Sequence, residues 1–185
     1  MQHFPLTMRA HILVRVLTQG RGIYVDMTAG NGNDSLVMAK LLQHDGHLYA
    51  FDVQQEALDN TLALLTENNI DEKSYSLRLD SHENIDQYIK MPITAAMYNL
   101  GYLPNGDKAL TTRSDSTVAS LKKVLPRLKN GGIITIIAYP GHDGGEEYYA
   151  VDNYLSGLPA REYEISRTEM LGKMFSPVLY LIIKR

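Results

Sequence analysis

The chain alternates between short, mostly apolar runs and longer segments in which apolar residues recur every three or four positions. Runs of about four to eight apolar residues are typical of buried strands, whereas the wider spacing is typical of amphipathic helices. The pattern predicts helices over residues 6–17, 35–42, 54–68, 85–88, 116–128 and 146–156. It predicts strands over residues 23–26, 47–53, 75–79, 93–100, 133–139, 162–168 and 178–183.

The spacing of the apolar residues also indicates which face of each helix packs against a sheet. In the first helix this face is expected to consist of Met8, Ile12, Leu13, Val16 and Leu17. In the next two helices the corresponding residues are Leu36, Met38, Ala39 and Leu42, and then Ala57, Leu58, Leu62 and Leu65.

Strands and helices alternate through most of the chain, which is typical of a parallel sheet with helices on both faces. The β-branched run over residues 133–137 suits a strand that is buried on both sides. The last two strands have little sequence between them, which indicates an antiparallel hairpin at one edge. With 185 residues, 44% of them hydrophobic and 21% charged, the chain is expected to form one α/β domain over residues 1–185, with a mostly parallel, seven-stranded sheet.

The composition excludes some kinds of chemistry. There is no cysteine, so neither a disulfide nor a cysteine-based metal site is possible, and no metal centre is expected. Methylation of a pyrimidine ring carbon usually requires attack by a thiolate, which this chain cannot supply. A nitrogen or oxygen acceptor is therefore favoured for any methyl transfer to RNA. The net charge of -3 gives no argument for nucleic-acid binding.

Hydropathy gives an expected location. The N-terminus, Met-Gln-His-Phe-Pro, has no positive segment followed by an apolar run, as a secretory signal would. No stretch approaches the roughly 18 apolar residues that a membrane-spanning helix needs. A cytoplasmic location, without a membrane partner, is expected.

Small and acidic residues gather where the predicted strands end, and ligands bind at that edge of such sheets. Asp26 ends the first strand, and the turn Gly30-Asn31-Gly32 follows, in which glycine lets the backbone approach a ligand closely. The start of the next helix offers unpaired N–H groups to a ligand carboxylate. Asp52 ends the second strand about twenty residues later, where a carboxylate accepts both hydroxyls of an adenosine ribose.

Residues after the second and third strands complete the predicted cofactor site. Gln54 is expected to cover the ribose or the adenine edge, whereas Asp80, Ser81 and His82 border the adenine, with Asp80 accepting from its exocyclic amine. The alternatives are a dinucleotide and no cofactor at all. A dinucleotide is disfavoured because Ser35 replaces the third glycine of G-x-G-x-x-G and because a dehydrogenase generally needs a larger substrate domain. S-adenosylmethionine is the cofactor we expect.

The fourth predicted strand ends in Asn99-Leu100-Gly101-Tyr102, which resembles the Asn-Pro-Pro-Tyr motif of amino-methyltransferases with both prolines replaced. In that motif a side-chain carbonyl and a backbone carbonyl accept hydrogen bonds from the acceptor amine, and positioning of this kind supplies much of the catalysis. The aromatic ring of Tyr102 can stack on a base. The alternative is that Asn99 caps a turn and Tyr102 packs on the surface.

A long polar loop follows the fifth predicted strand and contains His142. An imidazole there can take a proton near neutral pH. The alternative is that His142 is a solvated loop residue and Asp143 a helix N-cap. Asn99, Tyr102 and His142 are the candidate catalytic residues.

Five segments occur in a fixed order, and together they are specific although each alone is not. They are Val25-Asp26-Met27-Thr28-Ala29-Gly30-Asn31-Gly32-Asn33-Asp34, Phe51-Asp52-Val53-Gln54, Asp80-Ser81-His82, Asn99-Leu100-Gly101-Tyr102-Leu103-Pro104 and Tyr139-Pro140-Gly141-His142. This set closely resembles the YtqB-like family, long labelled as rRNA methylases, over nearly the whole chain. The resemblance implies a Rossmann-like class I methyltransferase fold.

The resemblance also implies an activity. The family is associated with a tRNA methyltransferase that methylates the amine of 5-aminomethyl-(2-thio)uridine at the wobble position of the anticodon. By resemblance, S-adenosylmethionine is expected to contact Asn31, Asn33, Asp52, Gln54, Ser81 and His82, and a homodimer is expected. The alternatives are a methyltransferase of rRNA or of a small molecule, and a binding module that keeps the fold without chemistry.

Overall fold

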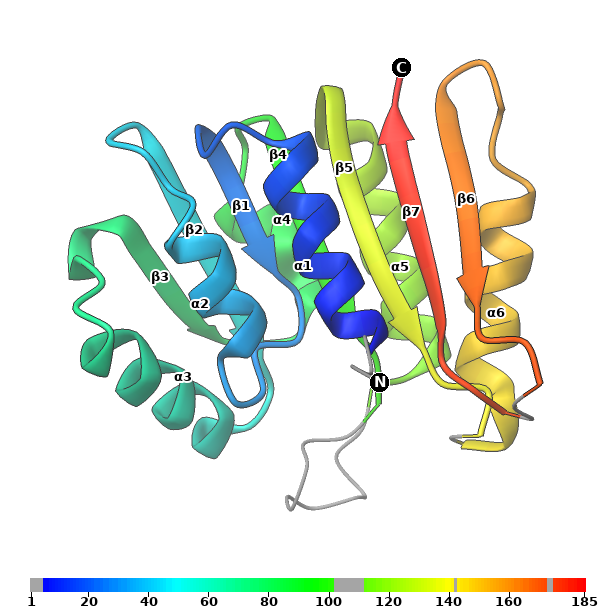
Figure 1. The fold of residues 1–185 in the computed structure, drawn as a ribbon, viewed down its shortest axis with the longest axis horizontal. Helices are drawn as coiled ribbons and strands as arrows, with labels where there is room; N and C mark the ends of the chain where they lie inside the picture. The colour runs from blue at the N-terminus through cyan, green and yellow to red at the C-terminus, as the bar shows by residue number, and fades with distance from the viewer. Residues whose placement is uncertain (1–4, 102–111, 142, 173–174) are drawn as a thin grey trace.

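The computed structural model describes residues 5–101, 112–141, 143–172 and 175–185, and its seven strands form one sheet (Figure 1). The strand order is β3-β2-β1-β4-β5-β7-β6. The first five strands in this order are parallel, and β7 runs antiparallel to both of its neighbours. Their bounds are β1 Gly22–Asp26, β2 Gly46–Asp52, β3 Tyr75–Leu79, β4 Ile93–Asn99, β5 Leu128–Ala138, β6 Tyr163–Glu169 and β7 Val178–Lys184. The predicted sheet with its C-terminal antiparallel hairpin is confirmed.

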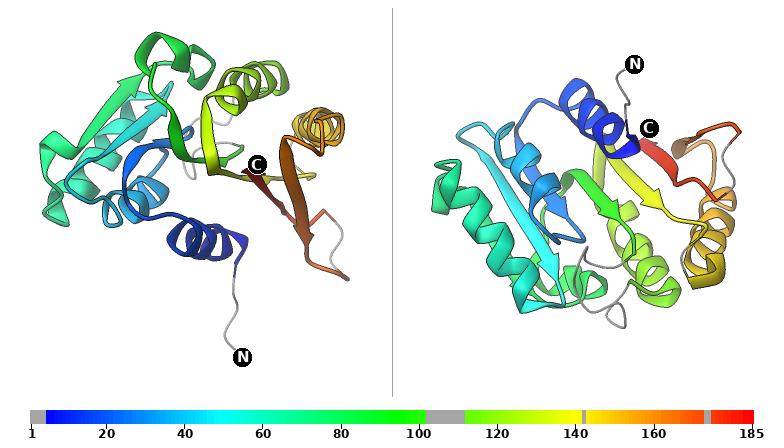
Figure 2. Two further views of the ribbon diagram at one scale, coloured as in Figure 1. Left: turned by 90° about the horizontal axis from the view of Figure 1, so that it is seen from above. Right: turned by 60° about the horizontal axis from the view of Figure 1, so that its bottom comes forward.

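Three helices cover each face of the sheet (Figures 1 and 2). Helices α1, α2 and α3 share an apolar cluster with one face, and α4, α5 and α6 share the main cluster with the other. The bounds are α1 Leu6–Leu17, α2 Asn33–Ala39, α3 Gln55–Glu67, α4 Ile85–Tyr88, α5 Ser114–Val124 and α6 Glu146–Ser156. Short 3-10 turns, which the apolar pattern did not predict, lie at Glu72–Ser74, His82–Asn84, Leu125–Arg127 and Asp143–Gly145.

The central strands are as apolar as predicted. Every residue of β4 before Asn99 is buried, and so are residues 133–138 of β5. Because helices pack on both sides, neither strand shows the alternation of a half-exposed strand. These two strands therefore fix Asn99 and the end of β5 rigidly within the sheet.

The predicted inner face of α1 is wrong. Leu6, Ala10 and Val14 are the buried residues, whereas Met8, Ile12, Val16 and Leu17 are between 40% and 74% exposed. Both sets recur every four residues, so helical spacing alone cannot choose between them. The small Ala10 lets the helix backbone approach the sheet, which a face of large side chains would prevent.

One residue predicted on the inner face of α3 is also wrong, and so is the predicted start of β5. Thr61 is buried in α3, whereas Leu62 is 44% exposed. Residues 130–132, which precede the strand predicted over residues 133–139, lie inside β5, where the register against β4 shifts between Ile93 and Ala95. A Cβ on Gly132 would lie 2.8 Å from the Lys129 carbonyl oxygen, so this irregular stretch requires glycine.

The strand order places the predicted site residues at one edge. Parallel strands end at the same edge of a sheet, so the segments that follow β1, β2, β3, β4 and β5 lie together there. The order also reverses between β1 and β4, which is where ligands bind in such sheets. Among the described residues, no helix is both long and apolar enough to cross a membrane.

Candidate active site

Asp26, the last residue of β1, is completely buried at this edge. Its carboxylate accepts hydrogen bonds from the Thr28 N–H at 3.1 Å and from the Ser35 hydroxyl at 2.6 Å. Burial is the main cause that raises the pKa of Asp26 to about 7, and the nearby Asp34 raises it further against the effect of the Ser35 hydrogen bond. A cation bound here would favour the ionised carboxylate.

The loop after β1 depends on its two glycines. Gly30 has φ 53° and Gly32 φ 79°, both in the left-handed region that favours glycine. A Cβ on Gly32 would lie 2.8 Å from the Cα of Thr61 in α3, so the loop sits directly against that helix. Asn31 and Asn33 are exposed, and the Asn31 side-chain oxygen accepts from Asn60 at 3.1 Å.

Asp52, at the end of β2, ties this loop to the next one. One carboxylate oxygen accepts from the Gly30 N–H and the other from the Gln54 N–H, each at 3.0 Å. An ionised carboxylate offers about four acceptor positions, so two backbone bonds leave room for ribose hydroxyls. The structure thus brings Asp26, Gly30, Asp52 and Gln54 together, as predicted.

After β3, Asp80 organises the turn itself. Its carboxylate accepts from the Ser81 N–H at 2.7 Å and from the side chains of Asn84 and Tyr88 at 2.8 Å. Burial raises the pKa of Asp80, but these three hydrogen bonds together hold it below its usual value. These bonds give Asp80 a part in shaping the turn, and they leave one of about four acceptor positions of the carboxylate for a further donor. The expected contact of Asp80 with adenine stays a prediction.

His82 is buried beside the same turn, and its ring packs edge-on against Tyr98 with 5.8 Å between centroids. Burial lowers the pKa of His82 to about 4, so the imidazole is neutral at pH 7. Its Nδ1 has no hydrogen-bond partner among the described residues. Ser81, which precedes it, accepts weakly from the Glu83 N–H at 3.4 Å. A buried, unpaired ring nitrogen is available to a polar ligand atom.

Asn99 is fixed from both sides at the end of β4. Its N–H donates to the Thr28 hydroxyl at 2.9 Å, and its side-chain oxygen accepts from the Tyr139 hydroxyl at 3.0 Å. Tyr139 immediately follows β5, and burial together with the charge of Asp34 raises the pKa of its hydroxyl. The side-chain carbonyl of Asn99 is therefore held in one orientation and keeps a second lone pair for another donor.

A buried carboxylate on α6 fixes the backbone just after Asn99. The Gly101 N–H donates to the Thr112 hydroxyl at 2.7 Å, and the Thr112 N–H donates back to the Gly101 carbonyl at 3.0 Å. The Thr112 hydroxyl in turn donates to Glu147 at 2.6 Å, and Thr117 donates to the other oxygen of Glu147 at 2.6 Å. We call Gly101, Thr112 and Glu147 the Gly101 clamp.

Sequence reasoning missed several residues of this edge. His11 of α1 lies 2.5 Å from the carboxylate of Asp34, which is buried in the first turn of α2. The pair is far apart in sequence, and nothing in the apolar pattern connects them. Ser35 directly follows the first motif segment and Tyr139 begins the last one, so their places next to Asp26 and Asn99 follow from the strand ends.

Two candidate catalytic residues, Tyr102 and His142, lie outside the described residues. The alternative interpretation of Asp143 is supported in part. Its carboxylate accepts from the N–H groups of Gly145 and Glu147 at the start of α6, each at 3.1 Å, but Gly145 occupies the N-cap position itself. No group of three or more potential metal ligands occurs among the described residues.

Fold and site together define the class of the protein: it is a Rossmann-like, S-adenosylmethionine-dependent methyltransferase. The sheet order, the glycine loop after β1 and the carboxylate at the end of β2 carry this conclusion. The chain belongs to the family described as "Putative rRNA methylase", which matches residues 48–184. The family predicted from the motifs is thereby confirmed.

Individual relatives match nearly the whole chain. A protein of Arabidopsis thaliana, "tRNA (mnm(5)s(2)U34)-methyltransferase, chloroplastic", is 35% identical over 95% of this chain and 68% of its own length. The crystal structure of a "putative rRNA-methylase" from Clostridium thermocellum has 35% identity and a TM-score of 0.94 over 100% of both chains. A "putative methyltransferase" from Streptococcus mutans, solved in complex with SAH, has 33% identity and a TM-score of 0.90 over 100% of both chains.

The residues of the site fit the cofactor of this class. Asp26, Asp34 and Asp52 place negative charge beside the loop after β1, which suits a ligand that carries a sulfonium and an ammonium group. The Nδ1 of His82, which has no partner among the described residues, lies after β3 at the same edge of the sheet. The close packing of Gly32 on α3 excludes a side chain at that position of the loop.

Proposed function

We propose that this protein is a tRNA methyltransferase that transfers a methyl group to the amine of 5-aminomethyl-(2-thio)uridine at the wobble position. The observation that carries the proposal is the orientation of Asn99, whose side-chain oxygen is held by Tyr139 and whose N–H is held by Thr28. The 35% identity to a tRNA methyltransferase across 95% of the chain supports this choice of substrate.

In this proposal the loops after β1, β2 and β3 bind S-adenosylmethionine. Asp26 and residues 30–33 hold the methionine part, Asp52 and Gln54 the ribose, and Ser81 and His82 the adenine. The bound cofactor supplies an electrophilic methyl group on its sulfonium. Because Asp26 and Asp52 are tied into the loops by backbone hydrogen bonds, their carboxylates are oriented before the cofactor arrives.

Asn99 and the Gly101 clamp form the acceptor side. The Asn99 oxygen accepts an N–H of the substrate amine, which turns the nitrogen lone pair toward the methyl group. Alignment of a neutral amine with a reactive sulfonium supplies much of the rate by itself. Tyr102 as a base-stacking residue and His142 as a proton acceptor stay predictions.

Labelled cofactor tests the proposal directly. The purified protein is incubated with labelled S-adenosylmethionine and tRNA from cells that lack this protein, and the tRNA nucleosides are analysed by mass spectrometry. We expect conversion of 5-aminomethyl-(2-thio)uridine to the methylaminomethyl form. Asn99→Ala should bind the cofactor normally but transfer no label.

The same assay separates the alternatives. Label in rRNA, with the wobble uridine unchanged, would support an rRNA methyltransferase and overturn the proposal. Label only in a small molecule would do the same. Cofactor binding without transfer to any acceptor would support a binding module.

We further propose that two copies of the chain pair through the exposed face of α1, which consists of Met8, Ile12 and Val16. Three large apolar side chains on one exposed helix face are unusual for a surface that faces only water. Half-buried Leu181 and Ile183 of β7 extend the apolar surface on the same side of the sheet.

The cytoplasmic location and the single domain over residues 1–185 stay predictions.

A further inference from the structure

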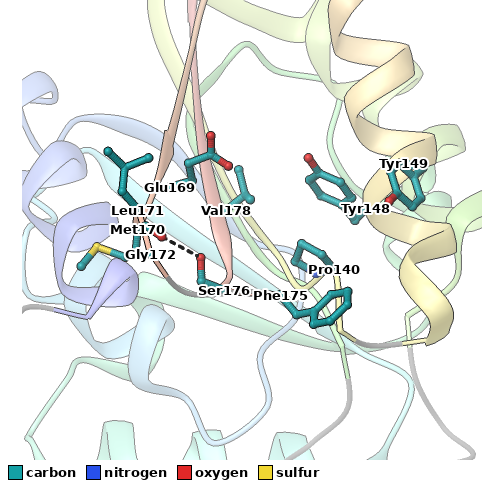
Figure 3. Close-up of a pocket in the computed structure, with 10 residues that line it drawn as sticks. All are labelled: Pro140, Tyr148, Tyr149, Glu169, Met170, Leu171, Gly172, Phe175, Ser176 and Val178. Atoms are coloured by element: carbon teal, nitrogen blue, oxygen red, sulfur yellow. Dashed lines mark hydrogen bonds between the residues drawn. The ribbon is translucent and has the colours of Figure 1, made fainter.

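An aromatic pocket lies beside the acceptor side, between α6 and the connection from β6 to β7 (Figure 3). Its volume is about 370 Å³, within the range of small ligand sites. Its wall includes Pro140, Tyr148, Tyr149, Glu169, Phe175 and Ser176. Pro140 directly follows Tyr139, whose hydroxyl holds Asn99, so the pocket continues from the acceptor side along the same edge of the sheet.

The rings of Tyr149 and Phe175 are exposed, unlike the aromatic residues of the core. Tyr149 is 61% exposed and Phe175 67% exposed, whereas Tyr24 and Phe51 are completely buried. The half-buried Tyr148 packs edge-to-face against Tyr149 on α6, with 5.0 Å between centroids, and so supports the exposed ring. Exposed, fixed rings are surfaces on which an unstacked base can lie.

The backbone holds Phe175 in place at some energetic cost. Its φ is 57°, a left-handed conformation that is rare for a bulky side chain. A Cβ added to Gly141 would lie 3.3 Å from the Cβ of Phe175, so Phe175 packs directly over a glycine. Strained residues of this kind cluster at ligand sites.

The polar groups of the pocket favour a base over a phosphate. The carboxylate of Glu169 lines it and would repel a phosphate, but it accepts hydrogen bonds from an exocyclic amine. Arg167 lies 3.6 Å from that carboxylate, and its other ion pair is with Asp152. The pocket therefore offers aromatic faces to a ring and an acceptor to its edge.

We propose that this aromatic pocket binds a second, unstacked nucleobase of the RNA substrate. This base carries an exocyclic amine and neighbours the nucleotide that is methylated. The inference rests on the proposed function. It adds a subsite that binds a neighbouring base while the target uridine lies at Asn99.

The test places 2-aminopurine, a fluorescent base with an exocyclic amine, at each loop position of an anticodon stem-loop in turn. Stacking on an aromatic ring quenches its fluorescence, so we expect one position near the target to be quenched when the wild-type protein binds. Phe175→Ala and Tyr149→Ala should abolish that quenching and weaken RNA binding by roughly 5- to 150-fold, the range given by base stacking on an aromatic ring. Phe175→Tyr should retain both.

Controls separate stacking from folding and from cofactor binding. Leu62→Ala removes an apolar side chain that is 44% exposed on α3 and should leave RNA binding unchanged. All variants should bind S-adenosylmethionine as the wild type does. Glu169→Gln should reduce the preference of the protein for 2-aminopurine over unsubstituted purine at the quenched position.

The outcomes for this inference and for the proposed function are distinct. If the stem-loop is methylated but no position shows quenching that depends on Phe175, the pocket does not bind a base and the proposed function stands. If no tRNA is methylated, the proposed function is wrong and this inference falls with it.

Discussion

Asp26 shows how one buried residue links cofactor binding to pH. Burial, and the charge of Asp34 in addition, raise the pKa of Asp26 to about 7, so the carboxyl group of the free protein is largely protonated below that pH. A cationic ligand favours the ionised form, and its binding must release the proton. The affinity for S-adenosylmethionine should therefore rise as the pH increases from 6 to 8. Titration calorimetry in buffers of different ionisation enthalpy measures both the affinity and the proton release.

The matched control for Asp26→Asn is the same substitution at an exposed aspartate. Asp26→Asn should bind more weakly and lose the pH dependence, because no proton remains to be released. Asp45→Asn changes an exposed carboxylate far from the site and should behave as the wild type. A wild-type affinity that stays constant between pH 6 and pH 8 would contradict this role of Asp26.

The Gly101 clamp gives a second prediction for single residues. Thr112→Val removes the hydroxyl that accepts from Gly101 and donates to the buried Glu147. Loss of the acceptor of the Gly101 N–H and of one of the donors to Glu147 should lower the free energy of unfolding by about 1–3 kcal/mol, measured by urea denaturation. Methyl transfer should slow while the affinity for S-adenosylmethionine stays unchanged, because the clamp fixes only the acceptor side.

Thr112→Ser separates the hydrogen bonds from the packing of the threonine methyl group. It keeps the hydroxyl and should restore the transfer rate to near the wild-type value. If Thr112→Val and Thr112→Ser slow the reaction equally, the hydrogen bonds of the clamp are not what positions the acceptor side.

At the scale of elements, the loop from β1 to α2 depends on its packing against α3. Gly32→Ala introduces a Cβ 2.8 Å from the Cα of Thr61 at a φ of 79°. Gly131→Ala is its matched control, because that glycine has a φ of 74° and open space around it. The left-handed backbone should cost both variants about 1–2 kcal/mol.

The contact with Thr61 distinguishes the two glycines. Overpacking typically costs a further 1–3 kcal/mol, so Gly32→Ala should be the less stable variant in thermal unfolding. It should also bind S-adenosylmethionine more weakly, whereas Gly131→Ala binds it normally. Equal loss of stability in the two variants, with normal binding in both, would show that the contact with α3 is unimportant.

The elements were predictable where local pattern and burial agree. The apolar run of β4 and the helix over residues 146–156 appear within one residue of the predicted bounds, whereas β5 begins five residues earlier than predicted. The pattern failed for α1 because two apolar stripes share one period and only the sheet decides which of them is buried. The 3-10 turns were missed because side-chain hydrogen bonds such as Lys73 N–H to Asp71 fix them.

At the scale of the whole molecule, the sequence predicts which residues reach the site when they end a strand. Asp26, Asp52 and Asn99 do so, and the strand order alone brings them to one edge. His11, Asp34 and Glu147 enter the site through packing between elements that are distant in sequence. No local pattern carries that information, because it arises only when the helices dock on the sheet.

The exposed face of α1 gives the prediction that concerns the assembled molecule. If two copies pair through this face, the same residues meet across a two-fold axis, and one substitution changes both sides of the interface. Ile12→Glu would bury a carboxylate without a partner. It should raise the dissociation constant of the dimer at least about tenfold, measured by analytical ultracentrifugation over a range of concentrations.

Met91→Glu is the matched control for self-association. Met91 is 52% exposed, comparable to the 47% of Ile12, but it precedes β4 at the opposite edge from the candidate site. Its substitution should leave the dimer intact. Neither variant should change the affinity for S-adenosylmethionine, because the α1 residue beside the candidate site is His11, which pairs with Asp34. A wild-type protein that sediments as a monomer at every concentration would overturn the pairing, and the exposed face of α1 would then need a different partner. Equal weakening by both substitutions would instead place the interface elsewhere, since only one of the two residues lies on α1.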